Sequence, residues 1–326
     1  MKRRVVSGIR PTGRLHIGHL HGALLNWKEL QDEYDCFYFI ADWHALTSEY
    51  ASPEIIRKST MDIIIDWLAV GLDPKKCTFF IQSHIEEHSE LHLIFSMITP
   101  IPWLERNPTY KEQMQELSTK NLNTYGFLGY PVLQAADILM YKANAVPVGE
   151  DQAPHIELTR EIARRFNFLY KKVFPEPETL LTPTSKLLGI DRRKMSKSYN
   201  NAIFITEPSD VVSKKVSQMI TDPQRGRKTD PGRPEICNVF SYHEIYTPEK
   251  KVREIEEACR TAGIGCVECK RLMAENLNKG LEPIREARRE LESKMDYVEN
   301  VITEGNKRAK AAAQKTMQEV REAIGI

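Results

Sequence analysis

Two short motifs, far apart in the chain, hold the side chains best suited to phosphate chemistry. They are His16-Ile17-Gly18-His19 and Lys194-Met195-Ser196-Lys197-Ser198. Imidazole rings can donate hydrogen bonds to phosphate oxygens, and lysine ammonium groups on flexible stems can follow negative charge as it moves to a leaving group. The two motifs therefore predict a reaction in which charge moves between phosphate groups.

The first motif lies at the start of a predicted helix. Residues 5–6 are typical of a buried strand, residues 7–13 form a loop with glycine and proline, and residues 15–31 have apolar positions at helical spacing. The amino end of a helix presents free N–H groups to an anion, and Gly18 leaves room for a purine ring to approach the backbone. This order of elements predicts a nucleotide cradle.

Each motif alone has a simpler interpretation. The two histidines can be solvated residues near a helix start, and the lysines can belong to a solvated basic loop. Together, the motifs resemble the HIGH and KMSKS signatures of class I aminoacyl-tRNA synthetases. The resemblance implies that ATP, with Mg²⁺, is used to form an aminoacyl-adenylate, with His16, His19, Lys194, Ser196 and Lys197 as catalytic residues. It adds Arg10, Pro11, Thr12, Gly18, Met195 and Ser198 as further ATP contacts.

Two further segments, residues 129–139 and 146–152, resemble the tryptophanyl branch of that family. The second would hold the ATP ribose through Gly149, Glu150 and Asp151, since a carboxylate at the end of a strand can accept from a ribose hydroxyl. The tryptophan contacts implied by the resemblance are Asp137, Tyr130, Gln152, His44 and Gln134. The chain departs from many bacterial relatives at Arg10, which leaves the ATP contacts of that turn open.

Asp137 is the residue expected to decide the amino acid. It is a lone carboxylate in an apolar helical segment, and its simpler interpretation is a solvated or capping acid. The indole N–H can only donate, so a buried carboxylate is a suitable acceptor. Tyrosine or phenylalanine would leave that acceptor without its partner, and a site of this kind discriminates by roughly 10⁴–10⁵.

Four of the six cysteines lie close together in the second half of the sequence, spaced C-x21-C-x6-C-x2-C. They are Cys237, Cys259, Cys266 and Cys269. Disulfides are rare in a cytosolic enzyme, so a Cys₄ metal site is the better prediction, with chance clustering of free thiols as the alternative. A subset of tryptophanyl synthetases carries a [4Fe–4S] cluster at such a quartet, and this chain resembles that subset. We favour that cluster over Zn²⁺.

Composition and hydropathy place few limits on partners. The chain has 326 residues, 41% apolar content and a formal charge of +1, so any tRNA footprint must come from local basic patches rather than net charge. The amino-terminal sequence shows no signal-peptide pattern, and the longest apolar stretch, residues 93–104, contains two prolines and is too short to span a bilayer. We expect a soluble cytoplasmic protein without a membrane partner.

The pattern of elements predicts an α/β fold, with a Rossmann-type parallel sheet followed by an all-helical domain. Strands are expected at 5–6, 37–41, 78–81 and 146–148, and helices at 53–70, 86–98, 128–140, 152–166, 208–220, 248–262, 266–294 and 296–324. We expect a catalytic domain at 1–187 with a helical dimerisation insertion at about 82–125. A helical anticodon-binding domain at 188–300 with the Cys₄ site would follow, then a helix at 301–326 packing back onto the catalytic domain.

These observations predict a homodimeric tryptophan–tRNA ligase that acts on ATP, L-tryptophan and tRNA(Trp). The nearest alternative is a tyrosyl-tRNA synthetase of the same class. A nucleotidyltransferase with an H-x-G-H motif is an alternative from another class, but its downstream signature differs from residues 194–198. A non-catalytic paralogue that binds tRNA or tryptophan would not require both motifs to be intact.

Overall fold

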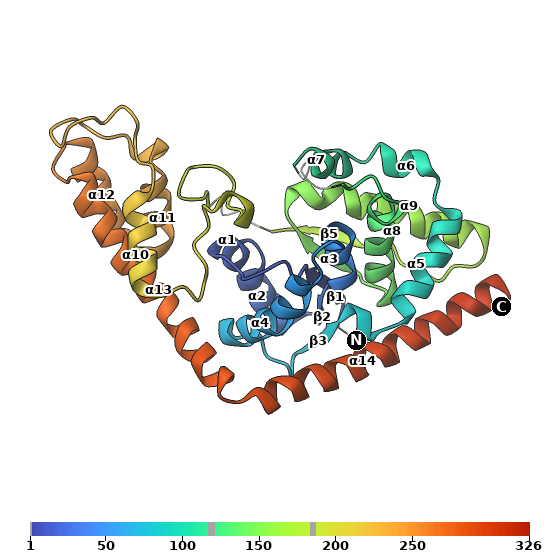
Figure 1. The fold of residues 1–326 in the computed structure, drawn as a ribbon. Helices are drawn as coiled ribbons and strands as arrows, with labels where there is room; N and C mark the ends of the chain where they lie inside the picture. Colours follow the sequence, from blue (N-terminus) through green and yellow to red (C-terminus); the bar gives the residue numbers. More distant parts are fainter. Residues whose placement is uncertain (1, 117–120, 183–186) are drawn as a thin grey trace. The chain divides into compact units, whose positions relative to one another are not determined.

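The computed structural model describes residues 2–116, 121–182 and 187–326. The chain divides into two compact units (Figure 1). The sheet-bearing unit comprises Met1–Arg14, Gly22–Pro183 and Leu291–Ile326, and the helical unit comprises Leu15–His21 and Thr184–Glu290. Both signature motifs therefore belong to the helical unit, although one of them lies near the amino terminus.

A five-stranded parallel sheet forms the centre of the sheet-bearing unit, with strand order β3-β2-β1-β4-β5. The strands are β1 (Arg4–Ile9), β2 (Asp35–Ile40), β3 (Cys77–Ile81), β4 (Ala145–Val148) and β5 (Glu178–Leu181). The predicted α/β fold is confirmed. Strand β5 was not predicted, because it is short, half exposed and preceded by two prolines that are more typical of a loop.

Helices cover both faces of the sheet. The helices of this unit are α2 (Leu25–Glu33), α3 (Asp42–Glu49), α4 (Glu54–Val70), α5 (Glu87–Ile98), α6 (Ile101–Glu105), α7 (Pro108–Glu116), α8 (Tyr125–Met140), α9 (Ala153–Leu169) and α14 (Met295–Ile324). On one face Trp27 stacks on Tyr38, and Trp67 packs at a tilt against Phe79. On the other, alternate strand residues such as Phe37 pack against α5, α8 and α9.

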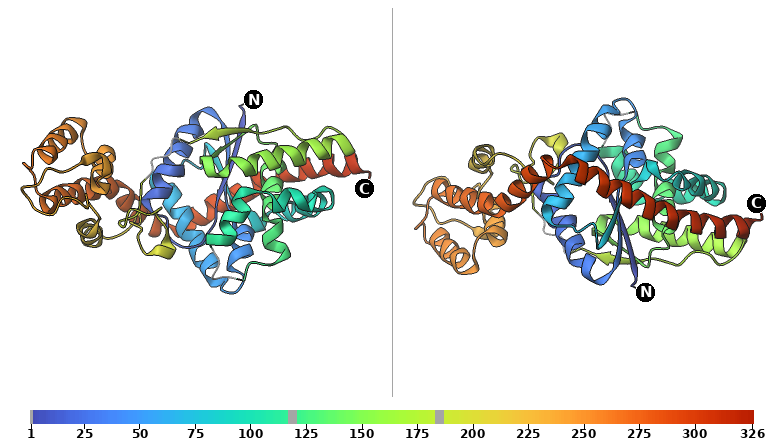
Figure 2. Two further views of the ribbon diagram at one scale, coloured as in Figure 1. Left: turned by 90° about the horizontal axis from the view of Figure 1, so that it is seen from above. Right: turned by 90° about the horizontal axis from the view of Figure 1, so that it is seen from below.

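Helix α14 lies along the edge strand β3, as Figure 2 shows from below. A Cβ atom on Gly305 would lie 1.7 Å from the carbonyl oxygen of Phe79, so only glycine allows this close backbone approach. Buried α14 residues, including Ala309, Ala313 and Met317, join the same apolar core as the sheet. The last helix is therefore part of the unit that contains the sheet.

The helical unit contains α1 (Ile17–His19), α10 (Ser209–Gln218), α11 (Asn238–Tyr246), α12 (Glu249–Arg260) and α13 (Cys266–Glu292). The prediction of one regular helix over 15–31 was wrong. A π-helical turn, Leu20–Leu24, separates α1 from α2, and Gly18 and Gly22 weaken helix preference there. Helix α11 was not predicted, since the segment around it is rich in loop-forming proline and glycine.

Residues 183–186, just before the predicted domain boundary at 187/188, lie outside the described residues, and so does part of the predicted insertion, 117–120. None of the described helices combines the length and the apolar character needed to span a bilayer.

Candidate active site

The turn that carries the two histidines is attached to the segment that follows the lysine motif. His16 pairs with Phe204 in an isolated antiparallel bridge, and the N–H of Ile17 donates to the carbonyl of Ile203 at 2.9 Å. His16 also caps α1, because its N–H donates to Nδ1 of His19 at 3.2 Å. Backbone pairing within the helical unit thus joins the histidine motif to residues 203–204, a few positions after the lysine motif.

The imidazoles of His16 and His19 lie against each other, with ring centroids 3.7 Å apart. Burial, with a smaller effect from the Lys197 charge, lowers the pKa of His16 to about 4. Burial, then His16 and Lys197, also lowers the pKa of His19. Both rings are therefore neutral at physiological pH. The space left by Gly18 is taken by the His16 ring, with Met195 beyond it, while the expected purine contact stays a prediction.

The lysine motif is a loop whose backbone is fixed by one buried amide. Asn201 Oδ1 accepts from the N–H of Ser196 at 2.8 Å, and Asn201 Nδ2 donates to the carbonyl of Lys194 at 3.1 Å. Gly189 must lack a side chain, because a Cβ atom there would lie 2.3 Å from Asn201 Nδ2. Lys194 remains exposed and Lys197 half-buried, while the Ser198 side chain lies outside what the structure describes. Asn201 was not predicted from the sequence.

Two loops at the carboxyl ends of β1 and β4 carry the other predicted ATP contacts. After β1, the N–H of Thr12 donates to the carbonyl of Arg10 at 2.9 Å, and Pro11 is buried between them. After β4, the carboxylate of Asp151 folds over Gly149, where a Cβ atom would lie 2.7 Å from Asp151 Oδ1. Glu150 and Asp151 remain exposed. In open parallel sheets, this edge is where ligands bind.

Asp137 is not the lone carboxylate that the sequence suggested. Gln82 Nε2 donates to both of its oxygens at 2.7 and 2.9 Å. His44 Nε2 lies 2.9 Å from Oδ2, and His88 Nδ1 lies 2.6 Å from Oδ1. With the carboxylate 1% exposed, the interpretation as a solvated or capping acid is wrong. Gln82 and His88 were missed, since nothing in their spacing relates them to residue 137.

The hydrogen bonds around Asp137 keep it ionised. Burial, the largest influence, acts to raise its pKa, but hydrogen bonds from His44 and His88 leave that pKa below the ordinary value. His88 continues the network, because its Nε2 lies 2.7 Å from the hydroxyl of Tyr141. The carboxylate is therefore a fixed negative acceptor within an apolar core.

The other predicted tryptophan contacts lie on α8 and at the start of α9. Tyr130, Gln134 and Asp137 share one face of α8, and the Tyr130 ring lies 6.4 Å from that of His44. The Tyr130 hydroxyl is 3.1 Å from His155 Nε2, and Asn107 Nδ2 donates to His155 Nδ1 at 3.2 Å. Gln152 is half-buried just before α9. The structure therefore brings His44, Tyr130 and Asp137 together.

The four clustered cysteines come from the start of α11, the end of α12 and the start of α13. Arg225 Nη1 donates to the sulfur atoms of Cys259 and Cys266 at 3.7 and 3.8 Å. Burial, followed by the thiols of Cys237, Cys259 and Cys266, raises the pKa of Cys269 to about 12. Among the described residues, no three His, Cys, Asp or Glu side chains are arranged to hold a single metal ion.

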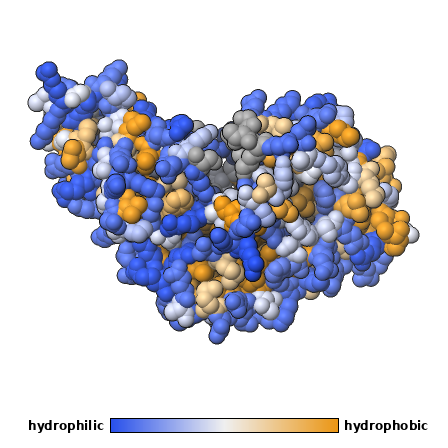
Figure 3. Space-filling model, viewed as in Figure 1, coloured by the Kyte–Doolittle hydropathy of each residue, from blue (hydrophilic) through white to orange (hydrophobic). Residues whose placement is uncertain are grey.

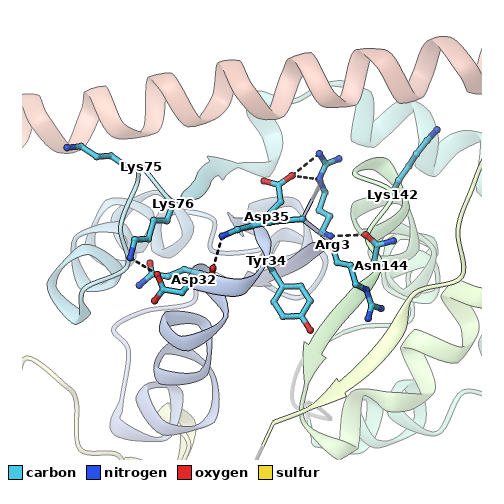
Figure 4. A pocket seen from close by; sticks show the side chains of 11 residues that line it. Arg3, Asp32, Tyr34, Asp35, Lys75, Lys76, Lys142 and Asn144 are labelled. Carbon is cyan, nitrogen blue, oxygen red and sulfur yellow. Dashed lines mark hydrogen bonds and ion pairs between the residues drawn. The ribbon is translucent and has the colours of Figure 1, made fainter.

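A different hollow, of about 820 Å³, lies at the amino ends of β1 and β2 (Figure 4). It is rich in cations, and Arg3, Arg4, Lys76 and Lys142 are paired with carboxylates. Arg4 Nε donates to Asp35 at 2.9 Å, and Lys76 donates to Asp32 at 2.6 Å. Because these opposite charges compensate one another, the hollow is a surface of ion pairs rather than a candidate catalytic site.

Comparison with known proteins identifies the family. A family model described as class I tRNA synthetases (W and Y) matches residues 1–282. The chain belongs to the class I tRNA synthetases. It is 53% identical to a tryptophan–tRNA ligase of Thermotoga maritima, over 99% of each chain. It is 49% identical to a tryptophan–tRNA ligase of Aquifex aeolicus, over 99% of this chain and 100% of that one.

The solved structures agree. The tryptophanyl-tRNA synthetase of Campylobacter jejuni, in complex with ADP and tryptophan, is similar with a TM-score of 0.89 and 34% identity, over 99% of this chain and 100% of that one. A tyrosyl-tRNA synthetase of Archaeoglobus fulgidus, at 22% identity and a TM-score of 0.68, shares the fold alone. The predicted enzyme class and tryptophan–tRNA ligase activity are confirmed, and the tyrosyl alternative is set aside.

Proposed function

We propose that the chain activates L-tryptophan with ATP and transfers it to tRNA(Trp), with the residue roles that follow. The observation that carries the substrate assignment is the buried, ionised Asp137, held by three side-chain donors in the same unit as the proposed ribose-binding loop. A fixed acceptor of this kind suits the indole N–H, which can only donate. The strongly hydrogen-bonded environment of the carboxylate also disfavours purely apolar side chains.

In the activation step, the tryptophan carboxylate attacks the α-phosphorus of ATP, and pyrophosphate leaves. Mg²⁺ carried by the ATP phosphates would neutralise part of their negative charge. Lys194, Ser196 and Lys197 stabilise the leaving charge, and the neutral His16 and His19 donate to phosphate oxygens. Arg10, Pro11 and Thr12 contact the triphosphate from the loop after β1, while Gly149, Glu150 and Asp151 hold the ribose. Gly18, Met195 and Ser198 complete the nucleotide contacts.

The protein supplies no covalent nucleophile in this scheme, so its rate enhancement comes from positioning and charge stabilisation. Tyr130 and Gln152 contact the α-amino group, and His44 and Gln134 line the indole pocket. A ribose hydroxyl at the end of the tRNA then takes the aminoacyl group from the adenylate. The cytoplasmic location expected from the sequence stays a prediction.

ATP–pyrophosphate exchange with each of the twenty amino acids tests the substrate assignment. We expect exchange with tryptophan alone, and tyrosine should be slower by roughly 10⁴-fold or more. The Asp151→Asn variant is a useful control, because it should raise the KM for ATP without changing the order of amino acids. Equal exchange with tyrosine and tryptophan would contradict the proposed role of Asp137.

We further propose that Cys237, Cys259, Cys266 and Cys269 hold a [4Fe–4S] cluster, with Zn²⁺ as the alternative. The support is the convergence of four thiols from three helices, together with a guanidinium that donates to two of the sulfur atoms. Thiolate ligands suit either metal. The cluster would stabilise the helical unit rather than take part in activation.

Anaerobic purification tests this site directly. We expect a brown protein with broad absorbance at roughly 400 nm and about four irons per chain. A colourless protein with one zinc would show a structural zinc site instead of the cluster. A metal-free protein would contradict both proposals. Cys266→Ser should weaken tRNA charging much more than pyrophosphate exchange. Cys36→Ser, at a buried thiol in the sheet, is the matched control.

We also propose the division of labour expected from the sequence. Residues 1–187 would catalyse activation together with the loop at 194–198, with a dimerisation insertion at about 82–125. The rest of residues 188–300 would bind the anticodon, and helix 301–326 would pack on the catalytic domain. Apolar side chains gather over α5, α6 and the end of α9 (Figure 3). Leu93, Met97 and Ile101 are 54, 73 and 58% exposed.

A second copy of the chain would cover this apolar surface in the proposed homodimer. Analytical sedimentation measures the oligomeric state directly. The native protein should be dimeric, and the double substitution Met97→Glu with Ile101→Glu should produce monomers. Val267→Glu is the control, because Val267 is 86% exposed on the helical unit. A dimer that survives the paired substitution would contradict this interface.

A further inference from the structure

Helix α14 covers the open edge of the sheet at β3. An edge strand leaves N–H and C=O groups unpaired, and proteins often cover such an edge with another element. Here the close approach at Gly305 allows α14 side chains to reach the strand backbone. Two of these side chains, Asn306 and Arg308, bind opposite ends of β3.

Arg308 holds the amino end of the strand. Its Nη2 donates to the carbonyl oxygens of Pro74 and Cys77, both at 3.0 Å. These carbonyls are far along the strand from the residues that surround Asp137. Arg308 therefore provides an attachment that is similar in kind to that of Asn306 but remote from the proposed substrate pocket.

Asn306 holds the carboxyl end. Its Oδ1 accepts from the N–H of Ile81 at 3.0 Å, and its Nδ2 donates to Nδ1 of His84 at 2.9 Å. The amide thus contacts the residue just before the 3-10 turn Gln82–His84 and the last residue of that turn. Because the Asn306 amide accepts at one point of the chain and donates at another, it fixes both the position and the orientation of the turn.

This turn carries the side chains that orient the pocket. Gln82 is fully buried, donates to both oxygens of Asp137, and accepts from the N–H of Trp43 at 3.1 Å. The N–H of the next residue, Ser83, donates to Asp42 at 3.0 Å. Displacing the turn would therefore move the donor that contacts Asp137 through both of its oxygens.

We propose that Asn306 is a positioning residue for tryptophan: it fixes the Gln82–His84 turn, and Gln82 in turn sets the direction of the Asp137 carboxylate. The inference rests on the proposed role of Asp137 as the indole acceptor. Hydrogen bonds weaken steeply with misalignment, so a small shift of the acceptor is enough to weaken substrate binding. A helix at the far end of the sequence thereby contributes to amino-acid recognition.

The test compares Asn306→Ala with Arg308→Ala in pyrophosphate exchange. Asn306→Ala should raise the KM for tryptophan about 10-fold, as expected for a weakened hydrogen bond, with kcat and the KM for ATP within about twofold of the native values. Arg308→Ala should lower the unfolding midpoint but leave the KM for tryptophan within about twofold. Asn306→Asp should restore tryptophan binding, because its carboxylate accepts from Ile81 and from Nδ1–H of the other His84 tautomer.

If Asn306→Ala does not fold, His84→Ala removes one of the two contacts without altering α14, and it should raise the KM for tryptophan about threefold. An unchanged KM in the folded Asn306 variant, or in His84→Ala in its place, overturns the proposal. So does an equal rise in the KM for tryptophan from Arg308→Ala. Asp137→Asn in the same assay separates the two ideas: if it alters the tryptophan-to-tyrosine ratio while Asn306→Ala leaves the KM for tryptophan unchanged, only the role of Asn306 fails.

Discussion

The tryptophan pocket and the lysine loop place charged groups in opposite ways. In the pocket, Asp137 sits on a helix at 1% exposure, and three side chains donate to it. In the loop, Lys194 is exposed, and what is fixed is the backbone, through Asn201. In the pocket, hydrogen bonds fix the charged atoms of Asp137, and in the loop the hydrogen bonds of Asn201 fix the backbone that carries the lysines.

The difference matches the two tasks proposed for these regions. Recognition of an indole N–H needs an acceptor that does not move, because a misplaced acceptor would no longer reject tyrosine. Charge stabilisation during departure of pyrophosphate needs ammonium groups that can follow the charge, so long flexible side chains on a fixed backbone are suitable. Each region can be disturbed separately, which allows the comparison to be tested.

The largest expected effect is that of Lys197→Ala. Adenylate formation should fall by about 10²–10³-fold, because the lost charge is needed as pyrophosphate leaves. Equilibrium dialysis should show tryptophan affinity within about twofold of the native value, since the pocket is untouched. A comparable loss of tryptophan affinity would show that the loop and the pocket do not act separately.

Asp137→Asn should change specificity more than rate. The substitution leaves an amide where three donors meet a carboxylate, so one buried donor loses its partner. We expect the ratio of kcat/KM values for tryptophan over tyrosine to fall by about 10–100-fold. An unchanged ratio in a folded variant would make Asp137 a structural residue.

The contrast between the regions also explains which parts the sequence could predict. The lysine loop and the His16 turn are contiguous motifs, and the strands β1 to β4 are short apolar runs, so all of these could be recognised along the chain. Asp137 was found through its chain neighbours. Its donor Gln82 directly follows β3, and its donor His88 lies on α5. Only the folding of the sheet brings these two residues to α8.

Other features depend on tertiary contacts that have no local sequence signal. Strand β5 exists because it pairs with β4, although its own sequence resembles a loop. The π-helical turn after α1 breaks a segment whose apolar spacing predicted a regular helix. Asn201 is one polar residue in a polar loop, and its function as a backbone clamp depends on the close approach of Gly189. The sequence therefore predicted the residues that carry the chemistry better than the residues and elements that hold them in place.

Asn201→Ala tests the backbone clamp of the lysine loop. Losing the hydrogen bonds to Ser196 and Lys194 should lower kcat in pyrophosphate exchange about 10-fold and leave the KM for tryptophan unchanged. Asn200→Gly is the matched control, because Asn200 is exposed, has φ of +51°, and glycine adopts that conformation readily. Equal effects from both substitutions would show that the loop is sensitive to any change, not to the clamp.

The smallest effect concerns pH and the pocket residue His155. Burial, with a smaller effect from His44, lowers the pKa of His155 to about 4. Asn107 donates to its Nδ1, so a proton there would oppose the amide N–H. The folded protein therefore binds this proton less readily than the unfolded chain, whose histidine has a pKa near 6.5. The stability from this group is complete above about pH 6.5 and is lost as the pH falls toward 4.

The His155→Gln variant should remove this contribution to acid sensitivity. Between pH 7 and pH 5.5 the native protein should lose about 1 kcal/mol more of its free energy of unfolding than the variant, measured by urea denaturation at both pH values. His16, whose pKa burial also lowers to about 4, lies in the helical unit and keeps its own acid response in both proteins. Parallel losses in the native protein and the variant would show that His155 is readily protonated in the folded state, and that this side of the pocket is less rigid than the cage around Asp137.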